Sequence, residues 1–200
     1  MKKLAILCTI ALVTFLLVIP IVGCQQAQES ETEPDPGPVQ TPGEPAIEGL
    51  KYTNFEYGFS VEYPKDWDVM EDFMGMVFVF MGPLVLEGTY YININLGTEQ
   101  LTSDIPVKDY AKMVELTTKR TNTGYNKLDE YSTTISEQPA IVLTCTATVE
   151  QEGTTVELKD SVAVFIKDNV GYIITYDVPD EFHSQYADCF DLVISSFRFE

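Results

Sequence analysis

The segment YGFSVEYPKDW, residues 57–67, contains the first clear strand pattern of the chain and decides how the rest is interpreted. Phe59, Val61 and Tyr63 alternate with polar residues, which is the period of a strand with one buried face. Pro64 ends this strand, because proline lacks the N–H that a sheet ladder uses. The tryptophan that closes the segment begins a second run, so two short strands joined by a tight turn are predicted.

Beyond this segment the chain changes between two hydrophobic periods. A three- and four-residue period predicts one helix over Val107–Arg120 and another that begins near Pro179 or Asp180. A period of two predicts strands, and glycine and proline pairs such as Gly82-Pro83 are expected to break the chain between them. The predicted strands span Trp67–Glu71, Met76–Met81, Tyr90–Leu96, Leu128–Ser136, Ala140–Glu150, Thr154–Lys167 and Val170–Val178. The pattern predicts an α+β domain with a six- to eight-stranded, mainly antiparallel sheet and helices packed on it.

The same segment resembles the opening strands of the PsbP-like family, together with Tyr52-Thr53-Asn54 before it. The resemblance continues through the strand Gln138–Glu150 and the helix ending Ile194-Ser195-Ser196-Phe197, so it covers nearly the whole domain. This family includes an extrinsic photosystem protein and many bacterial and archaeal lipoproteins. The resemblance implies an α-β-α sandwich that is non-enzymatic and binds other proteins. It identifies a fold rather than an active site, and no binding residue or photosynthetic role is carried over.

The N-terminus has the pattern of an export signal. Two lysines precede an almost wholly apolar run over residues 4–19. Ile21–Cys24 then resembles a bacterial or archaeal lipobox, which predicts cleavage before Cys24 and lipidation of its thiol. The protein is therefore expected at the extracytoplasmic face of the membrane, held by its acyl chains. The alternative is an uncleaved anchor, since Leu4–Val22 is close to the roughly 20 residues that span a bilayer.

Composition divides the remaining chain into a linker and a domain. Residues 24–48 are rich in proline and glutamate and contain no basic or aromatic side chain, which is typical of a disordered tether. The organisation predicted is a signal peptide at 1–23, an acidic linker at 24–48 and one monomeric domain at 49–200. Without the signal the chain has 10 basic and 31 acidic residues, a net charge of about −21. This charge argues against nucleic acid as a partner, because phosphates are bound by basic side chains.

No catalytic arrangement is found in the sequence, so no enzyme activity and no cofactor is predicted. His183 is the only histidine. The spacing fixes no serine or cysteine beside it as a catalytic partner, and a surface histidine is expected. Four methionines lie close together in the sequence: Met70, Met74, Met76 and Met81. Their thioethers could hold Cu(I), but methionine more often fills gaps in a core.

Metal binding is left open by the acidic residues. No loop resembles a calcium-binding sequence, so solvated charge is expected, with a weak divalent site near Asp177–Glu181 as the alternative. The acidic groups considered are Asp68, Glu71 and Asp72, then Asp177, Asp180 and Glu181, and finally Asp160 with Asp168 on neighbouring strands.

Two cysteines remain in the domain, Cys145 and Cys189. Strand parity places Cys145 on the more apolar face of its strand, so it should be buried. Cys189 shares the apolar face of the last helix with Tyr186 and Val193. A disulfide between them would be compatible with export, and two free buried thiols are the alternative.

Two hypotheses for the function follow. The first is a membrane-tethered, non-catalytic module that binds or helps to assemble an unknown protein partner. The second is a solute- or ion-binding lipoprotein that serves a transporter, which would need a deep pocket with converging polar groups. A single domain of this size lacks the two lobes that usually close on a solute, so the first hypothesis is preferred.

Overall fold

The computed structural model describes residues 47–151 and 153–200. The predicted signal peptide, Cys24 and almost all of the predicted linker lie outside these residues. The two α-helices are α1 (Val107–Thr121) and α2 (His183–Ser196), and two short 3-10 helices are η1 (Leu86–Gly88) and η2 (Asp180–Phe182). The strands are β1 (Gly49–Asn54), β2 (Phe59–Pro64), β3 (Asp68–Phe73), β4 (Met76–Val85), β5 (Tyr90–Gln100), β6 (Thr123–Ile135), β7 (Gln138–Gln151), β8 (Thr154–Lys167), β9 (Val170–Asp177) and β10 (Arg198–Phe199).

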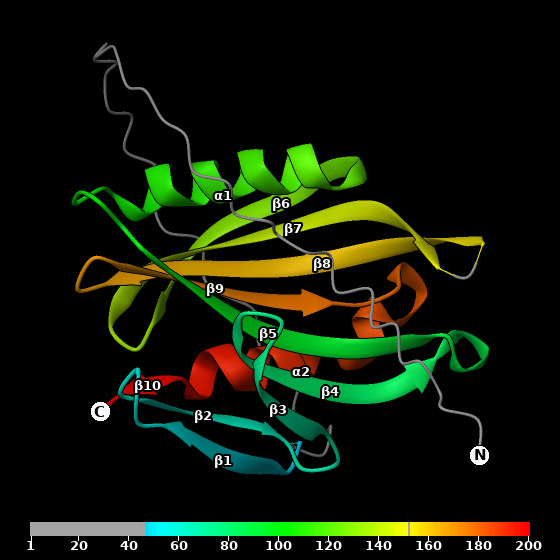
Figure 1. Cartoon of the computed structure of the whole chain (residues 1–200), viewed down its shortest axis with the longest axis horizontal. Helices are drawn as coiled ribbons and strands as arrows, with labels where there is room; N and C mark the ends of the chain where they lie inside the picture. Colours follow the sequence, from blue (N-terminus) through cyan, green and yellow to red (C-terminus); the bar gives the residue numbers. More distant parts are fainter. Residues whose placement is uncertain (1–46, 152) are drawn as a thin grey trace. The chain divides into compact units, whose positions relative to one another are not determined.

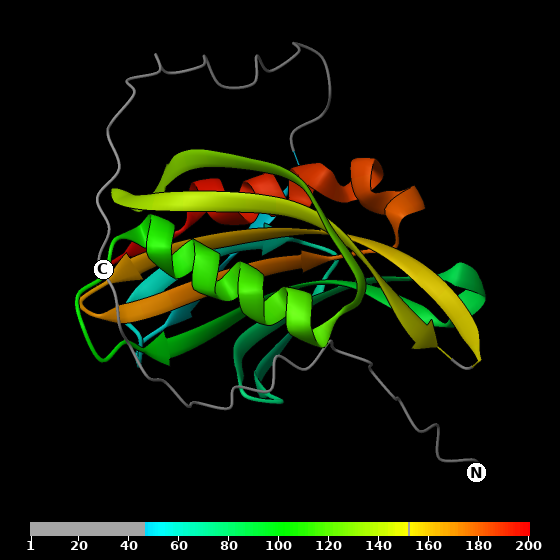
Figure 2. The ribbon, with the colours of Figure 1, turned by 90° about the horizontal axis from the view of Figure 1, so that it is seen from above.

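The strands form two antiparallel sheets. The large sheet has seven strands in the order β3-β4-β5-β9-β8-β7-β6, and the small sheet has the order β1-β2-β10. Helix α1 covers one face of the large sheet, while α2 and the small sheet lie on the other (Figure 1). Seen from above, α1 crosses the strands obliquely over the β6–β8 side of the sheet (Figure 2). The predicted α+β sandwich is confirmed.

Successive side chains of a strand point to opposite faces of the large sheet, so each central strand contributes apolar side chains to the cores on both faces. On β8, Val162 and Val164 pack with Tyr110 of α1, whereas Ala163 and Phe165 belong to the core under α2. The larger core also takes in aromatic residues of the small sheet and of α2. Phe59 on β2 stacks on Phe197 after α2 at 4.7 Å. The segment 57–67 thus joins the small sheet to α2.

Several details differ from the expectation, and those of β4 and β10 are the clearest. Strand β4 continues through Gly82-Pro83, where a break was predicted. The pairing with β5 shifts register between Met81 and Leu84, and such a bulge accommodates a proline that cannot donate to the ladder. A Cβ on Gly82 would lie 2.7 Å from Trp67, so glycine lets the indole ring cover the strand. Strand β10 was not predicted, and the ten-residue β4 is longer than the six residues expected.

The large sheet ends in two different edge strands. Strand β3 has only six residues. Strand β6 has thirteen, is almost entirely exposed and shifts register against β7 at two places. The exposed apolar side chains of this side include Leu128 on β6 and Met113 on α1.

Candidate functional site

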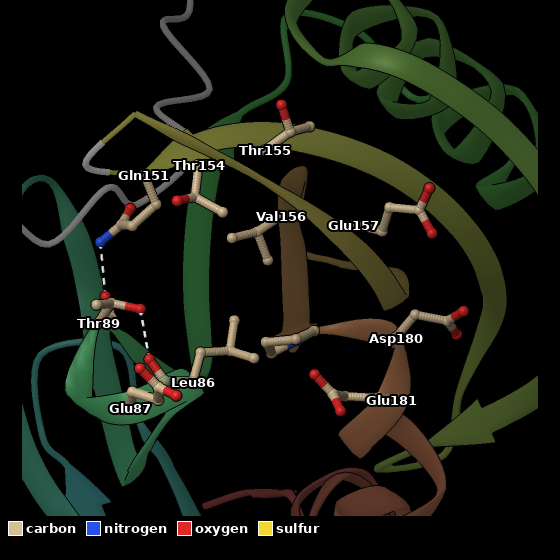
Figure 3. Close-up of a pocket in the computed structure, with 11 residues that line it drawn as sticks. Leu86, Glu87, Thr89, Gln151, Thr154, Thr155, Val156, Glu157, Asp180 and Glu181 are labelled. Carbon is tan, nitrogen blue, oxygen red and sulfur yellow. Dashed lines mark hydrogen bonds between the residues drawn. The ribbon is translucent and has the colours of Figure 1, made fainter.

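A groove with a volume of about 690 Å³ lies at one end of the large sheet. Its walls come from η1, the β7–β8 hairpin and the start of η2 (Figure 3). Glu87 adopts a positive φ of 55°, and Gly88 one of 89°, so η1 turns sharply before β5. The side chain of Gln151 donates a hydrogen bond of 2.7 Å to the carbonyl of Thr89 and so ties η1 to the hairpin.

Negative charge lines this groove. Glu87, Glu157, Asp180 and Glu181 are all exposed and belong to its lining, which includes no lysine or arginine. None of the four forms an ion pair with another described residue. A concave surface lined by one sign of charge attracts groups of the opposite sign. The groove is therefore chemically suited to a cationic ligand.

An apolar cluster supports the groove from below. Val156 of the lining packs with Leu158 and Tyr90, and both of these are buried. The hydroxyl of Tyr90 donates a hydrogen bond to Asp177, the last residue of β9. Two residues later Pro179 lines the groove and bridges to Leu158. The groove residues at the start of η2 are thus held in place by Leu158 of β8 and by Asp177 at the end of β9.

The fold separates the members of two of the predicted acidic groups. Asp180 and Glu181 line the groove, but Asp177 is buried behind it. Asp160 lies beside Asp177 and not beside Asp168, which is exposed and paired with Lys167 at 2.8 Å. Over residues 47–151 and 153–200, no group of three or more histidine, cysteine or acidic side chains could hold a metal ion.

His183 contacts a serine that spacing did not indicate. Its Nε2 lies 3.1 Å from the Oγ of Ser161, although the two residues are 22 positions apart. The hydroxyl of Tyr176 donates to the backbone carbonyl of His183 at 3.0 Å. Burial, followed by the charge of Lys159, lowers the pKa of His183. Ser161 is buried, and neither residue lines the groove, so the contact fastens the start of α2 to the sheet.

The two domain cysteines are free in this structure, which agrees with two buried thiols rather than with a disulfide. Cys145 pairs in register with Asp160 on the face toward α1, whereas Cys189 packs in the core under α2. The large sheet therefore lies between the two thiols. Cys145 is on an apolar face of β7, as predicted, but that face is the one turned away from α2. Both are buried as predicted. Burial raises the pKa of Cys145 to about 12 and that of Cys189 to about 11.

Three of the four clustered methionines pack together. Met70, Met76 and Met81 surround Val79 with Phe73 and Tyr91, as expected for methionine in a core. Met74 lies in the turn and is half exposed.

None of the helices in the described part of the chain is long and apolar enough to cross a membrane.

Comparison with known proteins places this fold in a family. A model of the PsbP-like proteins matches residues 7–199. The chain belongs to the PsbP-like family. No curated protein sequence matches it.

Several solved structures are similar. The solution structure of cyanobacterial PsbP (CyanoP) from Synechocystis sp. PCC 6803 shares 16% identity, with a TM-score of 0.57, and the match covers 82% of this chain and 99% of that one. LpqN, involved in cell envelope biogenesis of Mycobacterium tuberculosis, shares 14% identity over 76% and 90% of the two chains, with a TM-score of 0.57. The Ran-binding protein Mog1p of Saccharomyces cerevisiae shares 11% over 76% and 96%, with a TM-score of 0.53. At these identities the similarity shows the fold alone.

Proposed function

We propose that this protein is a non-catalytic accessory module, anchored through lipid on Cys24 at the extracytoplasmic face of the membrane, which binds a basic segment of another envelope protein. The observation that carries the proposal is the acidic groove. Its four exposed carboxylates have no ion pair among the described residues, and its lining has no basic side chain.

The groove is better suited to an extended basic segment than to a small anion or a neutral solute. Glu87 lies on one side of it, and Glu157 of β8, Asp180 and Glu181 lie on the other (Figure 3). Lysine or arginine side chains entering from outside would meet carboxylates along its length. Each such exposed pair contributes about 0.2–1 kcal/mol, and the combined field also raises the association rate.

The similar structures support a binding role. Mog1p is named as a Ran-binding protein, and LpqN as a protein involved in cell envelope biogenesis. For the alternative, solute or ion binding for a transporter, no observation in the domain gives specific support.

Photo-cross-linking of the full-length protein in its native membrane would test the proposal. A photoreactive residue replaces Thr155, which is exposed in the groove. We expect the cross-linked peptide, identified by mass spectrometry, to come from a segment rich in lysine and arginine.

Two triple variants make the test specific. Glu157→Gln, Asp180→Asn and Glu181→Gln remove three groove charges, and the matched control removes three exposed charges elsewhere through Glu56→Gln, Asp66→Asn and Asp188→Asn. Three lost pairs amount to roughly 2 kcal/mol, or about a 30-fold weaker affinity. We expect this loss in the groove variant only. An equal loss in both variants, or capture of a segment without basic residues, contradicts binding in the groove.

The anchor has its own test. Cys24→Ala should release the protein from the membrane fraction. Continued membrane association would instead support the uncleaved anchor.

A further inference from the structure

Two aspartates lie side by side within the large sheet. Asp160 on β8 and Asp177 on β9 are 6% and 4% exposed. The register pairs Ser161 with Tyr176, so the two aspartates are neighbours across the same pair of strands. Their carboxyl groups are within hydrogen-bonding reach of each other. Two carboxylates this close and this far from water repel each other strongly if both are ionised.

Asp177 is surrounded by hydrogen-bond donors. The hydroxyl of Tyr90 donates to its Oδ1, and Nδ2 of Asn93 lies 3.5 Å from its Oδ2. Asn95 donates in turn to Oδ1 of Asn93 at 2.9 Å, which orients the first amide. Donors to both oxygens stabilise the ionised form of a carboxyl group. Asp177 is therefore the member of the pair that holds the negative charge.

Asp160 has a different environment. Its Oδ1 is buried and has no hydrogen-bond partner among the described residues. The backbone N–H of Val178 is directed at this carboxyl group. An ionised buried carboxylate with an oxygen left unpaired is costly, whereas a protonated one becomes a donor itself.

The nearby lysine of the same row of side chains, Lys127 on β6, stands opposite Cys145, and its ammonium is already paired with Glu115 at 3.0 Å and with Glu130 at 2.9 Å. The titratable groups that face the pair are Tyr90 on β5, Cys145 on β7 and Glu115 on α1, and each is neutral or acidic. Lys159 and His183 influence each other on the opposite face of β8, toward α2.

We propose that Asp160 and Asp177 form a proton-binding site, which holds one proton between the two carboxyl groups at neutral pH and carries a single negative charge. The proton resides on Asp160, whose O–H donates to Asp177. This accounts for the unpaired oxygen and for the donors around Asp177, and it needs no cation beside the pair. It is independent of the function proposed for the groove.

Electrostatics agree with this geometry. Burial, and then the charge of Asp177, raises the pKa of Asp160 well above its ordinary value. Burial also raises the pKa of Asp177, while Tyr90 and Asn93 act in the lowering direction. Because the folded pKa of Asp160 is raised, the stability associated with its proton is fully present below the unfolded value of about 4, and is lost as pH rises through the folded value.

Infrared spectroscopy of the folded protein at neutral pH tests the proposal. A protonated carboxyl group has a C=O stretching band that an ionised carboxylate lacks. We expect this band in the wild type and its loss in Asp160→Asn. In the control, Asp168→Asn, it should remain, since Asp168 is exposed. A band retained in Asp160→Asn, or none in the wild type, overturns the assignment.

A second measurement needs no variant. With ¹³C-labelled aspartate, NMR of the wild type should show one side-chain carboxyl carbon that keeps the protonated chemical shift at neutral pH. Elemental analysis of the same sample separates a proton from a metal cation. A stoichiometric metal ion, together with ionised shifts for all aspartates, overturns the proposal in favour of a cation site.

Discussion

Gly171→Ala tests how α1 is seated on the large sheet. Gly171 lies on β9 directly under Tyr110, which is fully buried. A methyl group at this position would overlap the phenol, with Cε1 only 2.9 Å from the added carbon and the hydroxyl nearer still. Since Tyr110, Ala111 and Val114 form the buried face of α1, the whole helix would have to move.

The expected magnitude is a balance of two terms. Overpacking of a filled core costs about 1–3 kcal/mol. Replacing glycine by alanine within a strand recovers roughly 0.5–1 kcal/mol of chain entropy. The net destabilisation should be about 1.5 kcal/mol, or a drop of about 5 °C in Tm for a domain of this size.

Denaturant and thermal unfolding of the protein without its signal peptide, followed by circular dichroism, measure this change. Gly97→Ala on the neighbouring strand β5 is the matched control, because its new methyl group would meet Met76 at an ordinary 3.5 Å. We expect this control to be neutral or slightly stabilised. The reasoning is refuted if the two alanine variants are equally stable.

Two further predictions concern the core and the start of α2. Phe197→Ala should lower the free energy of unfolding by about 4 kcal/mol, because Phe197 is fully buried and stacks on Phe59 at 4.7 Å. Phe55→Ala, at a side chain that is 89% exposed, should change it by less than about 0.5 kcal/mol, and similar losses in both would contradict this packing argument. The lowered pKa of His183 predicts stability that is present above the unfolded value of about 6.5 and is lost as pH falls through the folded value. His183→Gln should remove this part of the pH dependence in denaturation curves between acidic and neutral pH; an unchanged curve would exclude His183 as its source.

Local patterns were enough to predict most elements, since a period of two or of three to four residues depends only on which face is buried. Thr154–Lys167 was predicted with the bounds that β8 has. Contacts between strands are different, because they depend on the strand order. Asp160 meets Asp177, and Ser161 meets His183, only because β9 lies between β5 and β8 and α2 follows it.

The same limit explains the errors at the cysteines and the groove. Parity placed Cys145 on an apolar face, but both faces of the central strands are apolar, so parity alone could not tell which helix covers it. Asp180 and Glu181 were noted as an acidic pair, whereas Glu87 and Glu157 come from distant turns and strands. Their sequence separation left no signal that they line one groove.

The two edges of the large sheet affect how the protein behaves at high local concentration. An open edge strand is a template on which a second molecule can add its own strand, and repeated addition builds fibres. The short β3 edge carries exposed Asp68, Glu71 and Asp72, so two such edges would repel each other. The long β6 edge is interrupted by its two register shifts, which disrupt a continuous row of free backbone groups. End-to-end growth of the sheet is thereby opposed at both sides, and many copies could crowd together without polymerising.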